Sequence, residues 1–286
     1  MKSGVLYIAS ESEYLVEAVQ SMESLRKVMP NTPIALIADV EEKPPYVDHL
    51  LDLNSIPSEY SDKVFNIQRT PFEKTIYLDT DTTVNNDISE IFDLLDNYEI
   101  AVAHNDNRTF MPGREYPVTN IPDCFPEYNT GVIGFNQRST DELFNRWREI
   151  YSNYTDEDYY LDQPAFRKAL FETDIYTATL PTEFNCRFHY GGYVAEEIRV
   201  FHGRHPAQSQ IFDQLNSTDS PRAFVKQGTD VSILDFREPH LIERLVAYVR
   251  YRQYENDFDL LSNTIKEDGI PTTIYKMYRN MCHRLK

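Results

Sequence analysis

The sequence contains no long apolar run, and this absence narrows the possible classes of protein. No stretch of about 18 or more apolar residues, the length that crosses a bilayer, occurs among the 286 positions. The first ten residues also lack the basic region and cleavage site of a secretory signal. We therefore expect a cytoplasmic protein without a membrane-spanning helix.

Cysteine is scarce, and its spacing excludes two structural roles. The three cysteines, Cys124, Cys186 and Cys282, are odd in number and far apart. Zinc sites and disulfide frameworks use closer, paired cysteines. We expect free thiols.

Basic residues are also few. The chain has 28 Lys and Arg against 46 Asp and Glu, a formal net charge of −18. Binding a nucleic-acid backbone requires clustered cations, so we predict no nucleic-acid partner. With 13% aromatic residues the chain is nevertheless a folded protein under an acidic surface. An anionic substrate would need a metal ion or a few local cations.

Short apolar runs alternate with helical patterns through the first two thirds of the chain. Strands are expected at residues 4–10, 34–38, 75–78, 100–104, 132–135, 175–180 and 198–202. Two capping boxes, Ser10 with Glu13 and Ser139 with Glu142, predict helix starts, and Trp147 is expected in the core. This order is typical of an α/β fold with a mainly parallel sheet. From residue 239 the pattern is wholly helical, so we predict domains at 1–238 and 239–286.

In an open α/β sheet, ligands bind at the carboxyl ends of the strands. Ser10, Asp39 and Asp79 each follow an expected strand. The sequence therefore places these three residues at the functional edge of the sheet.

An acidic pair at this edge carries the chemistry. Residues 76–81, IYLDTD, form an apolar strand followed by Asp79 and Asp81, one residue apart. Hard divalent ions bind oxygen ligands at about 2.0–2.6 Å, and such a turn can present two. A metal held there would bridge the phosphates of a nucleotide diphosphate and stabilise a leaving group. Such acidic pairs also occur in ordinary turns, so the motif alone leaves both interpretations open.

Other segments give this pair a context, because the chain resembles the glycogenin-like, family 8 type retaining glycosyltransferases over roughly residues 5–205. The matching segments are 6–10 with Tyr14, 70–81, 128–133, Asp162 with Gln163, and 199–203. The resemblance implies a GT-A fold, a Rossmann-like mixed sheet flanked by helices, here with a helical C-terminal extension. It also implies sugar transfer from a nucleotide-diphosphate sugar, for which uridine is the usual base in this family.

The resemblance assigns roles residue by residue. Asp79, Asp81 and His202 would hold Mn²⁺ or Mg²⁺. Asn129, Asp162 and Gln163 would contact the donor sugar and form the catalytic group, with Asp162 as the nominated carboxylate. The predicted donor-binding residues are Ala9, Ser10, Tyr14, Lys63, Thr80 and Arg204.

Several of these assignments have alternatives. Tyr14 either stacks on the nucleotide base or belongs to the apolar stripe of its helix. Lys63 either lies near the donor phosphate or is a solvated surface lysine. After His202 the chain reads Gly203-Arg204-His205-Pro206 where the family often carries a lysine, a proline and a tryptophan, so Arg204 is expected to replace that lysine. Closure of the site and the class of acceptor stay open.

Three other functions remain possible. Residues 76–83 also match the D-x-D-x-T motif of haloacid-dehalogenase-type phosphatases, although those enzymes usually carry it on their first strand. A sugar nucleotidyltransferase would need a glycine-rich basic loop where residues 9–13 read ASESE. A noncatalytic metal- or sugar-binding module would show no metal-dependent donor hydrolysis.

The C-terminal segment is amphipathic. Ile274, Tyr278, Met281 and Leu285 share one helical face, and Lys276, Arg279, His283 and Lys286 share the other. Such a helix either lies on the anionic inner face of a membrane, where lipid-linked acceptors are found, or docks on the domain. Sugars, lipid-linked sugars and proteins all remain candidate acceptors.

Overall fold

The computed structural model describes residues 2–53, 61–105, 120–122, 124–154, 161–204, 208–227 and 230–235. Nearly all of these belong to one compact unit, Met1–Ile233. Within these ranges no helix has the length and apolar character needed to cross a membrane. The predicted domain boundary after residue 238 and the amphipathic C-terminal helix lie outside the described residues and stay predictions.

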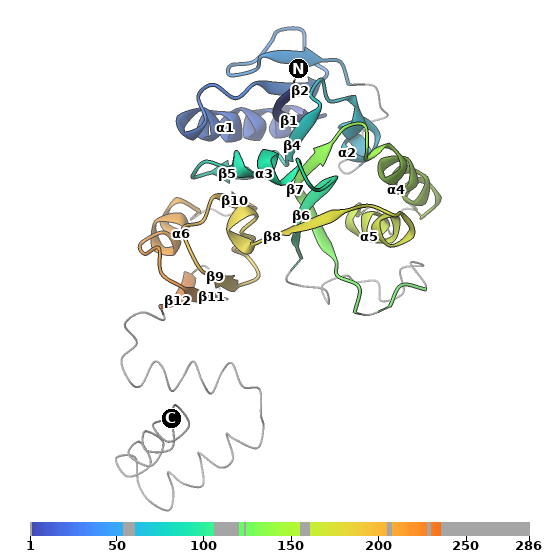
Figure 1. Cartoon of the computed structure of the whole chain (residues 1–286). Helices are drawn as coiled ribbons and strands as arrows, with labels where there is room; N and C mark the ends of the chain where they lie inside the picture. Colours follow the sequence, from blue (N-terminus) through green and yellow to red (C-terminus); the bar gives the residue numbers. More distant parts are fainter. Residues whose placement is uncertain are drawn as a thin grey trace, which may run out of the picture. The chain divides into compact units, whose positions relative to one another are not determined.

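A seven-stranded sheet forms the centre of this unit, in the order β3-β2-β1-β4-β7-β6-β8 (Figure 1). Neighbouring strands are parallel except at β7, which runs antiparallel to both β4 and β6. The predicted α/β fold with a mainly parallel, mixed sheet is therefore confirmed. The strands are β1 Ser3–Ala9, β2 Ile34–Ala38, β3 His49–Leu51, β4 Lys74–Leu78, β6 Ile100–His104, β7 Tyr128–Asn136 and β8 Thr177–Leu180.

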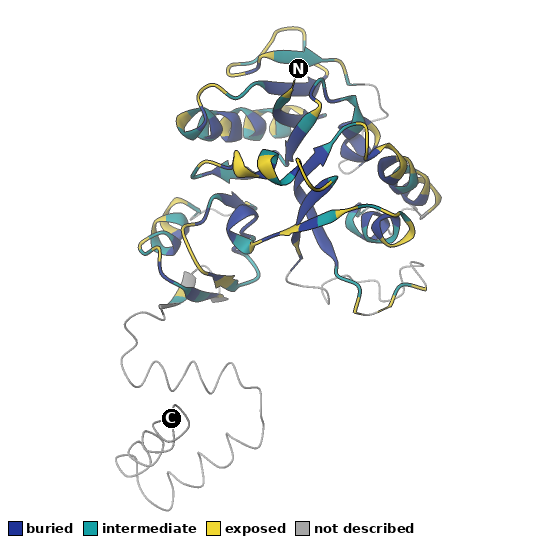
Figure 2. Cartoon of the chain, viewed as in Figure 1, coloured by how far each residue is buried: buried dark blue, intermediate teal, exposed yellow. Residues whose placement is uncertain are grey.

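Helices cover both faces of the sheet. Alternate residues of β1 divide between two cores, with Val5 and Tyr7 in one and Leu6 and Ile8 in the other, as the period of a strand requires. Figure 2 shows that the strands β1, β2, β4, β6 and β7 are buried along most of their length. One face is covered by α1 Ser12–Val28 and α3 Glu90–Leu94, and the other by α2 Ser61–Asn66, α4 Asp141–Tyr154 and α5 Gln163–Glu172.

A smaller layer lies beside the main sheet. The expected strand at 198–202 is present as β10, Val200–His202, but it pairs with β5, Thr82–Val84, in a separate two-stranded sheet. Their antiparallel register sets His202 opposite Thr82. This pairing brings the late histidine beside the turn that follows β4. A separate three-stranded sheet has the order β12-β11-β9 and consists of β9 Gly192–Val194, β11 Arg222–Gln227 and β12 Asp230–Asp235. Helix α6 spans Gln208–Leu215. The described residues also include two 3-10 helices, η1 Ile67–Arg69 and η2 Thr182–Phe184.

Both predicted helix starts are confirmed to within two residues, but the predicted capping boxes do not form. Helix α1 begins at Ser12, and its N-cap residue, Glu11, makes no side-chain cap hydrogen bond. Helix α4 begins at Asp141, and the hydroxyl of Ser139 donates to the backbone carbonyl of Asn136 instead. The expected core position of Trp147 is confirmed, because its side chain is fully buried.

Candidate active site

An open pocket of about 410 Å³ lies at the carboxyl ends of the central strands. Ser10, directly after β1, and Asp79, directly after β4, both line it. Asp39 follows β2, but it is exposed and does not belong to the lining. The functional edge is therefore narrower than the sequence predicts and centres on β1 and β4.

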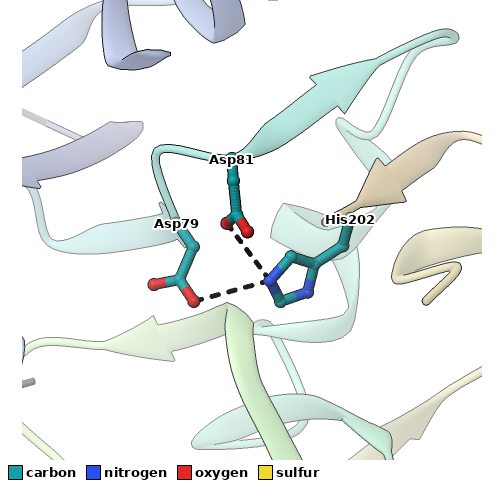
Figure 3. A group of neighbouring side chains, drawn as sticks. All are labelled: Asp79, Asp81 and His202. Carbon is teal, nitrogen blue, oxygen red and sulfur yellow. Dashed lines mark ion pairs between the residues drawn. The ribbon is translucent and has the colours of Figure 1, made fainter. Parts of the chain in front are cut away.

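Two carboxylates and one imidazole converge in this pocket (Figure 3). Nε2 of His202 lies 3.7 Å from Oδ2 of Asp79 and 3.3 Å from Oδ1 of Asp81. One potential ligand atom from each residue lies within 4.8 Å of the other two. Carboxylate oxygens and imidazole nitrogens are both common ligands of divalent metal ions. The predicted three residues thus form a cluster that can hold a divalent ion.

The second oxygen of each carboxylate is held by a neighbour. Oδ1 of Asp79 accepts hydrogen bonds from the hydroxyl of Tyr77 at 2.6 Å and from Nζ of Lys63 at 3.1 Å. Oδ2 of Asp81 lies 3.3 Å from Nη1 of Arg204. These contacts turn the remaining oxygen of each aspartate toward the imidazole. The carboxylates are therefore oriented for a metal before any metal binds.

Electrostatics favour the ionised form of the second aspartate. Burial alone would raise the pKa of Asp81, but the neighbouring His202 and Arg204 outweigh burial and hold that pKa well below its usual range. Burial and the adjacent Asp79 raise the pKa of the Tyr77 hydroxyl. Tyr77 consequently stays protonated and serves as a donor to the first aspartate.

Asn185 fixes the imidazole, a role that no pattern in the sequence predicted. Nδ1 of His202 lies 2.8 Å from Oδ1 of Asn185, an atom that can only accept, so Nδ1 carries the proton. Nε2 is then the ring nitrogen that faces the two carboxylates and that a metal ion would bind. Nδ2 of Asn185 donates to Oδ1 of Asn129 at 2.8 Å, which fixes the orientation of the amide. Asn185 lies in an irregular segment after η2, where no periodic pattern or motif marks it.

Gly131 makes room for the imidazole ring. A Cβ atom at this position would lie 2.1 Å from Cε1 of His202, far closer than van der Waals contact. The register between β6 and β7 shifts beside this glycine, a bulge that re-aims the backbone toward the pocket. Its carbonyl accepts the backbone N–H of Asp79 at 2.8 Å. The asparagine-containing segment 128–133 thus lies against the acidic pair.

Lys63 is buried, so its interpretation as a solvated surface lysine is wrong. Its Nζ lies 3.1 Å from Oδ1 of Asp79 and 3.0 Å from Oδ2 of Asp162, with 7% of the side chain exposed. It also donates to the hydroxyl of Thr130 at 3.0 Å. Burial lowers the pKa of Lys63, but the two carboxylates outweigh it and raise that pKa above its ordinary value. A charged lysine thus joins the metal end of the pocket to α5.

The predicted sugar-contacting residues lie together at the start of α5. Oδ2 of Asp162 accepts a hydrogen bond from the hydroxyl of Thr130 at 2.7 Å, and its backbone carbonyl accepts the indole N–H of Trp147 at 3.0 Å. Nδ2 of Asn129 donates to Oε1 of Gln163 at 2.5 Å. All three predicted residues line the pocket. The core tryptophan therefore also anchors the backbone of Asp162.

Comparison with known proteins identifies the family. A family model described as glycosyl transferase family 8 matches residues 63–208, just over half of the 286 residues. The chain belongs to glycosyl transferase family 8. The matched span includes all three residues of the Asp79, Asp81 and His202 cluster. No curated protein matches the chain.

Solved structures show that the family 8 chain shares its fold with known glycosyltransferases. Galactosyltransferase LgtC, solved with donor and acceptor sugar analogs, is 14% identical, with a TM-score of 0.54 over 76% of this chain and 96% of LgtC. An active-site mutant of LgtC is 15% identical, with a TM-score of 0.54 over 75% and 95% of the two chains. The apo form of GlyE from Streptococcus pneumoniae is 15% identical, with a TM-score of 0.51 over 77% of this chain and 61% of GlyE. The GT-A fold is thus confirmed.

Family membership also decides among the alternative functions. The family 8 chain is a glycosyltransferase, and the phosphatase and nucleotidyltransferase alternatives are wrong. The D-x-D-x-T pattern that suggested a phosphatase instead supplies a potential metal ligand from each aspartate. Its place after β4, and not after the first strand, agrees with this result.

At the mouth of the family 8 pocket, Arg204 forms a bidentate ion pair that the sequence did not reveal. Its Nε and Nη2 donate to the two carboxylate oxygens of Glu17, at 2.5 and 2.7 Å. The same carboxylate accepts the hydroxyl of Thr80 at 3.1 Å. Cζ of Arg204 lies 5.6 Å from the centre of the Tyr14 ring. Glu17 therefore links α1 to the turn between the aspartates and to the segment after β10.

Of the residues predicted to bind the donor, all but one line the pocket, and that one lies in the core. Tyr14 packs against the core beneath α1, which confirms its place in the apolar stripe of the helix, and it also lines the pocket, while its stacking on a nucleotide base stays a prediction. Ser10, Lys63, Thr80 and Arg204 line the pocket as predicted. The side chain of Ala9 packs into the core and is absent from the lining. Any contact from Ala9 to a ligand would therefore come from its backbone.

Proposed function

We propose that this family 8 glycosyltransferase transfers a sugar from a UDP-sugar to a hydroxyl group of an acceptor, uses Mn²⁺ or Mg²⁺, and retains the configuration of the donor. The observation that carries the proposal is the convergence of Asp79, Asp81 and His202 in one pocket. The complex of LgtC with donor and acceptor sugar analogs, in a shared fold, supports binding of two sugar substrates.

The pocket offers a partner for each part of a nucleotide-sugar donor. A divalent ion bound by the three ligands would offset the charge of the diphosphate and stabilise the leaving group. Arg204 carries a planar guanidinium at the mouth, a shape that matches phosphate oxygens. The Tyr14 ring beside it offers a surface on which the nucleotide base can stack.

The contacts of Asp162 bear on how retention is achieved. Its Oδ2 is held by Lys63 and by Thr130, and its side chain is 3% exposed. The ion pair with the charged Lys63 lowers the nucleophilicity of the whole carboxylate, which supports same-face attack over a covalent intermediate. The acceptor oxygen bonds to the anomeric carbon as the bond from that carbon to the phosphate oxygen breaks. The hydroxyl proton passes to the departing phosphate.

Asn129 and Gln163 complete this arrangement as positioning groups. Their mutual hydrogen bond fixes both amides, and both line the pocket beside Asp162. Amides held in this way can hydrogen-bond the hydroxyl groups of a sugar without a further loss of side-chain freedom. We therefore assign the donor sugar to the region between Asp162 and these two amides.

A thermal-shift screen tests the proposed function. UDP-sugars, GDP-sugars and ADP-sugars would be compared with and without MnCl₂ or MgCl₂. A ligand at about 100 times its dissociation constant adds about 2.7 kcal/mol of stability, so the cognate donor should raise Tm clearly. The rise should require the metal and vanish in Asp79→Asn and Asp81→Asn. If no nucleotide sugar raises Tm with either metal, the proposal is wrong. NMR of the product formed with an acceptor panel would report the anomeric configuration.

A further inference from the structure

A third cation lines the pocket, and the proposed function does not use it. Arg187 lies in the irregular segment after η2 and faces the pocket. The other two cations, Lys63 and Arg204, each form ion pairs with two carboxylates. Within the part of the chain that the structure describes, Arg187 forms no ion pair. Among the described residues, no carboxylate therefore has to be displaced before a ligand can pair with Arg187.

The guanidinium of Arg187 is held in place by neutral groups. Its Nη1 donates to Oδ1 of Asn105 at 2.8 Å, and its Cζ lies 4.4 Å from the centre of the Tyr190 ring. Asn105 is buried, and its Nδ2 donates to the carboxylate of Glu127 at 2.7 Å, which turns the amide oxygen toward the arginine. Among the described residues this contact uses one of five guanidinium N–H donors. The group is fixed, and most of its donors remain open.

Glu127 does not substitute for a direct partner. Burial raises the pKa of Glu127 above its ordinary value. The charge of Arg187 offsets this rise only weakly. The two charges act on each other across the Asn105 amide and form no ion pair. The amide thus separates them and keeps the guanidinium turned to the pocket.

Arg187 lies at the far end of a polar chain that starts at the metal ligands. Side-chain hydrogen bonds of 2.5 to 3.5 Å connect the imidazole to the guanidinium through five intervening residues. The diphosphate of a donor is assigned to the start of this chain. Gln163, one of the two amides beside the proposed sugar position, is linked to Arg187 through Glu127 and Asn105, so a group that reaches Arg187 is assigned to the transferred sugar or to the acceptor. The order is His202, Asn185, Asn129, Gln163, Glu127, Asn105 and Arg187.

We propose that Arg187 binds an anionic group, a carboxylate or a phosphate, carried by the transferred sugar or by the acceptor. This inference rests on the proposed function, because it assumes a nucleotide-sugar donor at the metal end. A guanidinium binds such oxyanions through paired, charge-assisted hydrogen bonds. A chain of net charge −18 repels an anionic substrate at long range, so an unpaired cation supplies the local attraction that binding needs.

Matched donor pairs test whether the transferred sugar carries the anion. Binding of UDP-glucose and UDP-glucuronic acid, and of UDP-galactose and UDP-galacturonic acid, would be measured by calorimetry with Mn²⁺. The wild type should prefer one uronic acid donor over its neutral match. Arg187→Gln should weaken binding of that donor by at least about tenfold and leave the neutral donor within about twofold. Arg187→Lys keeps the charge without the planar fork and should give an intermediate loss.

A surface arginine supplies the control. Arg146 pairs with Glu149 and Glu172 on the outside of α4 and α5 and does not line the pocket. Arg146→Gln makes the same change of charge and should leave both donor affinities unchanged. Equal Tm values of the ligand-free variants would show that a lost affinity is not a loss of fold.

A second pair of measurements tests the acceptor. If neutral and uronic acid donors bind the wild type alike, donor turnover would be measured with a methyl glycoside and with its 6-phosphate and 6-carboxylate forms. Arg187→Gln should then raise KM for a charged acceptor by at least about tenfold, with kcat and the neutral acceptor little changed. The inference is overturned if this substitution treats charged and neutral substrates alike in both assays. If the wild type binds no nucleotide sugar with Mn²⁺, the proposed function fails and the inference falls with it.

Discussion

Two ion pairs border the same pocket and differ in their exposure to water. The Lys63 and Asp162 side chains are 7% and 3% exposed, whereas those of Arg204 and Glu17 are 55% and 26% exposed. A buried pair that loses one member leaves an uncompensated charge in a poorly solvated site. An exposed pair is screened by water and contributes at most about 1 kcal/mol. The inner pair is therefore part of the framework, and the outer pair is free to change partners.

The inner end and the mouth of the pocket therefore have different roles. At the inner end, hydrogen bonds from Tyr77 and Lys63 orient Asp79 in advance, and the amide oxygen of Asn185 orients His202 by accepting from its Nδ1. At the mouth, Arg204 is held by a carboxylate that a phosphate can replace. A preorganised inner end favours the chemistry, and an adaptable mouth favours entry and release of the donor.

Removal of the buried cation should give the largest effect. Lys63→Met leaves Asp79 and Asp162 without their shared partner, and we expect a loss of about 3–5 kcal/mol in the free energy of unfolding. Urea denaturation measures this loss. Lys74→Met is the control, because Lys74 pairs with the exposed Asp96 and should cost about 1 kcal/mol or less. Equal losses of stability in the two variants would contradict the distinction between a buried ion pair that the fold needs and exposed ion pairs that can change partners.

Loss of the amide behind the imidazole should weaken metal binding. Asn185→Leu removes the acceptor that keeps the proton on Nδ1 of His202, so affinity for Mn²⁺ should fall by about 10- to 100-fold. Electron paramagnetic resonance of free Mn²⁺ measures the affinity. Asn185→Asp keeps the acceptor and should retain most of the binding.

A control variant separates this effect from general disturbance. Asn86 hydrogen-bonds to Glu197 outside the pocket, so Asn86→Leu should leave Mn²⁺ affinity unchanged. If Asn185→Leu binds Mn²⁺ as tightly as the wild type, the imidazole needs no partner, and the inner end is less preorganised than the hydrogen bonds indicate.

The strand that carries Asp79 could be predicted from the sequence, but the pairing that brings His202 beside it could not. The apolar strand before Asp79 has a clear pattern, and β4 follows from it because a buried strand needs only a short run of apolar residues. The cluster with His202 was predicted only through family resemblance, since β10 pairs outside the main sheet with a strand that the sequence did not reveal. Local periodicity carries no information about such a pairing.

The partners of the site residues escaped prediction for a related reason. The burial of Lys63 depends on Asp162, which is far along the chain, so composition around the lysine favours the surface. Asn185 and Arg187 lie in an irregular segment where no period exposes a pattern. Glu17 lies in a regular helix, but its face toward Arg204 is defined only by the fold. Long-range contacts, and not local propensity, determine these roles.

Removal of the outer cation should weaken donor binding and spare the fold. Arg204→Gln deletes a charge proposed to contact the diphosphate, so affinity for UDP with Mn²⁺ should fall by about tenfold. Stability should change by about 1 kcal/mol or less, because the pair with Glu17 is exposed. Calorimetry at low and high NaCl measures the affinity, and the difference between wild type and variant should shrink as salt screens the charge. A salt-independent difference would indicate a buried contact instead.

Removal of the outer carboxylate should give the smallest effect and the opposite sign. Glu17 now occupies two donors of Arg204, and an incoming phosphate must displace it. In Glu17→Gln the side chain competes less with phosphate for Arg204, so UDP should bind more tightly. The gain should be at most about fivefold, because an exposed ion pair contributes at most about 1 kcal/mol. Glu13→Gln makes the same change of charge at an exposed position one turn earlier in α1 and should have no such effect. Weaker binding in Glu17→Gln would mean that Glu17 positions Arg204 for the donor, and the mouth would then be as preorganised as the inner end.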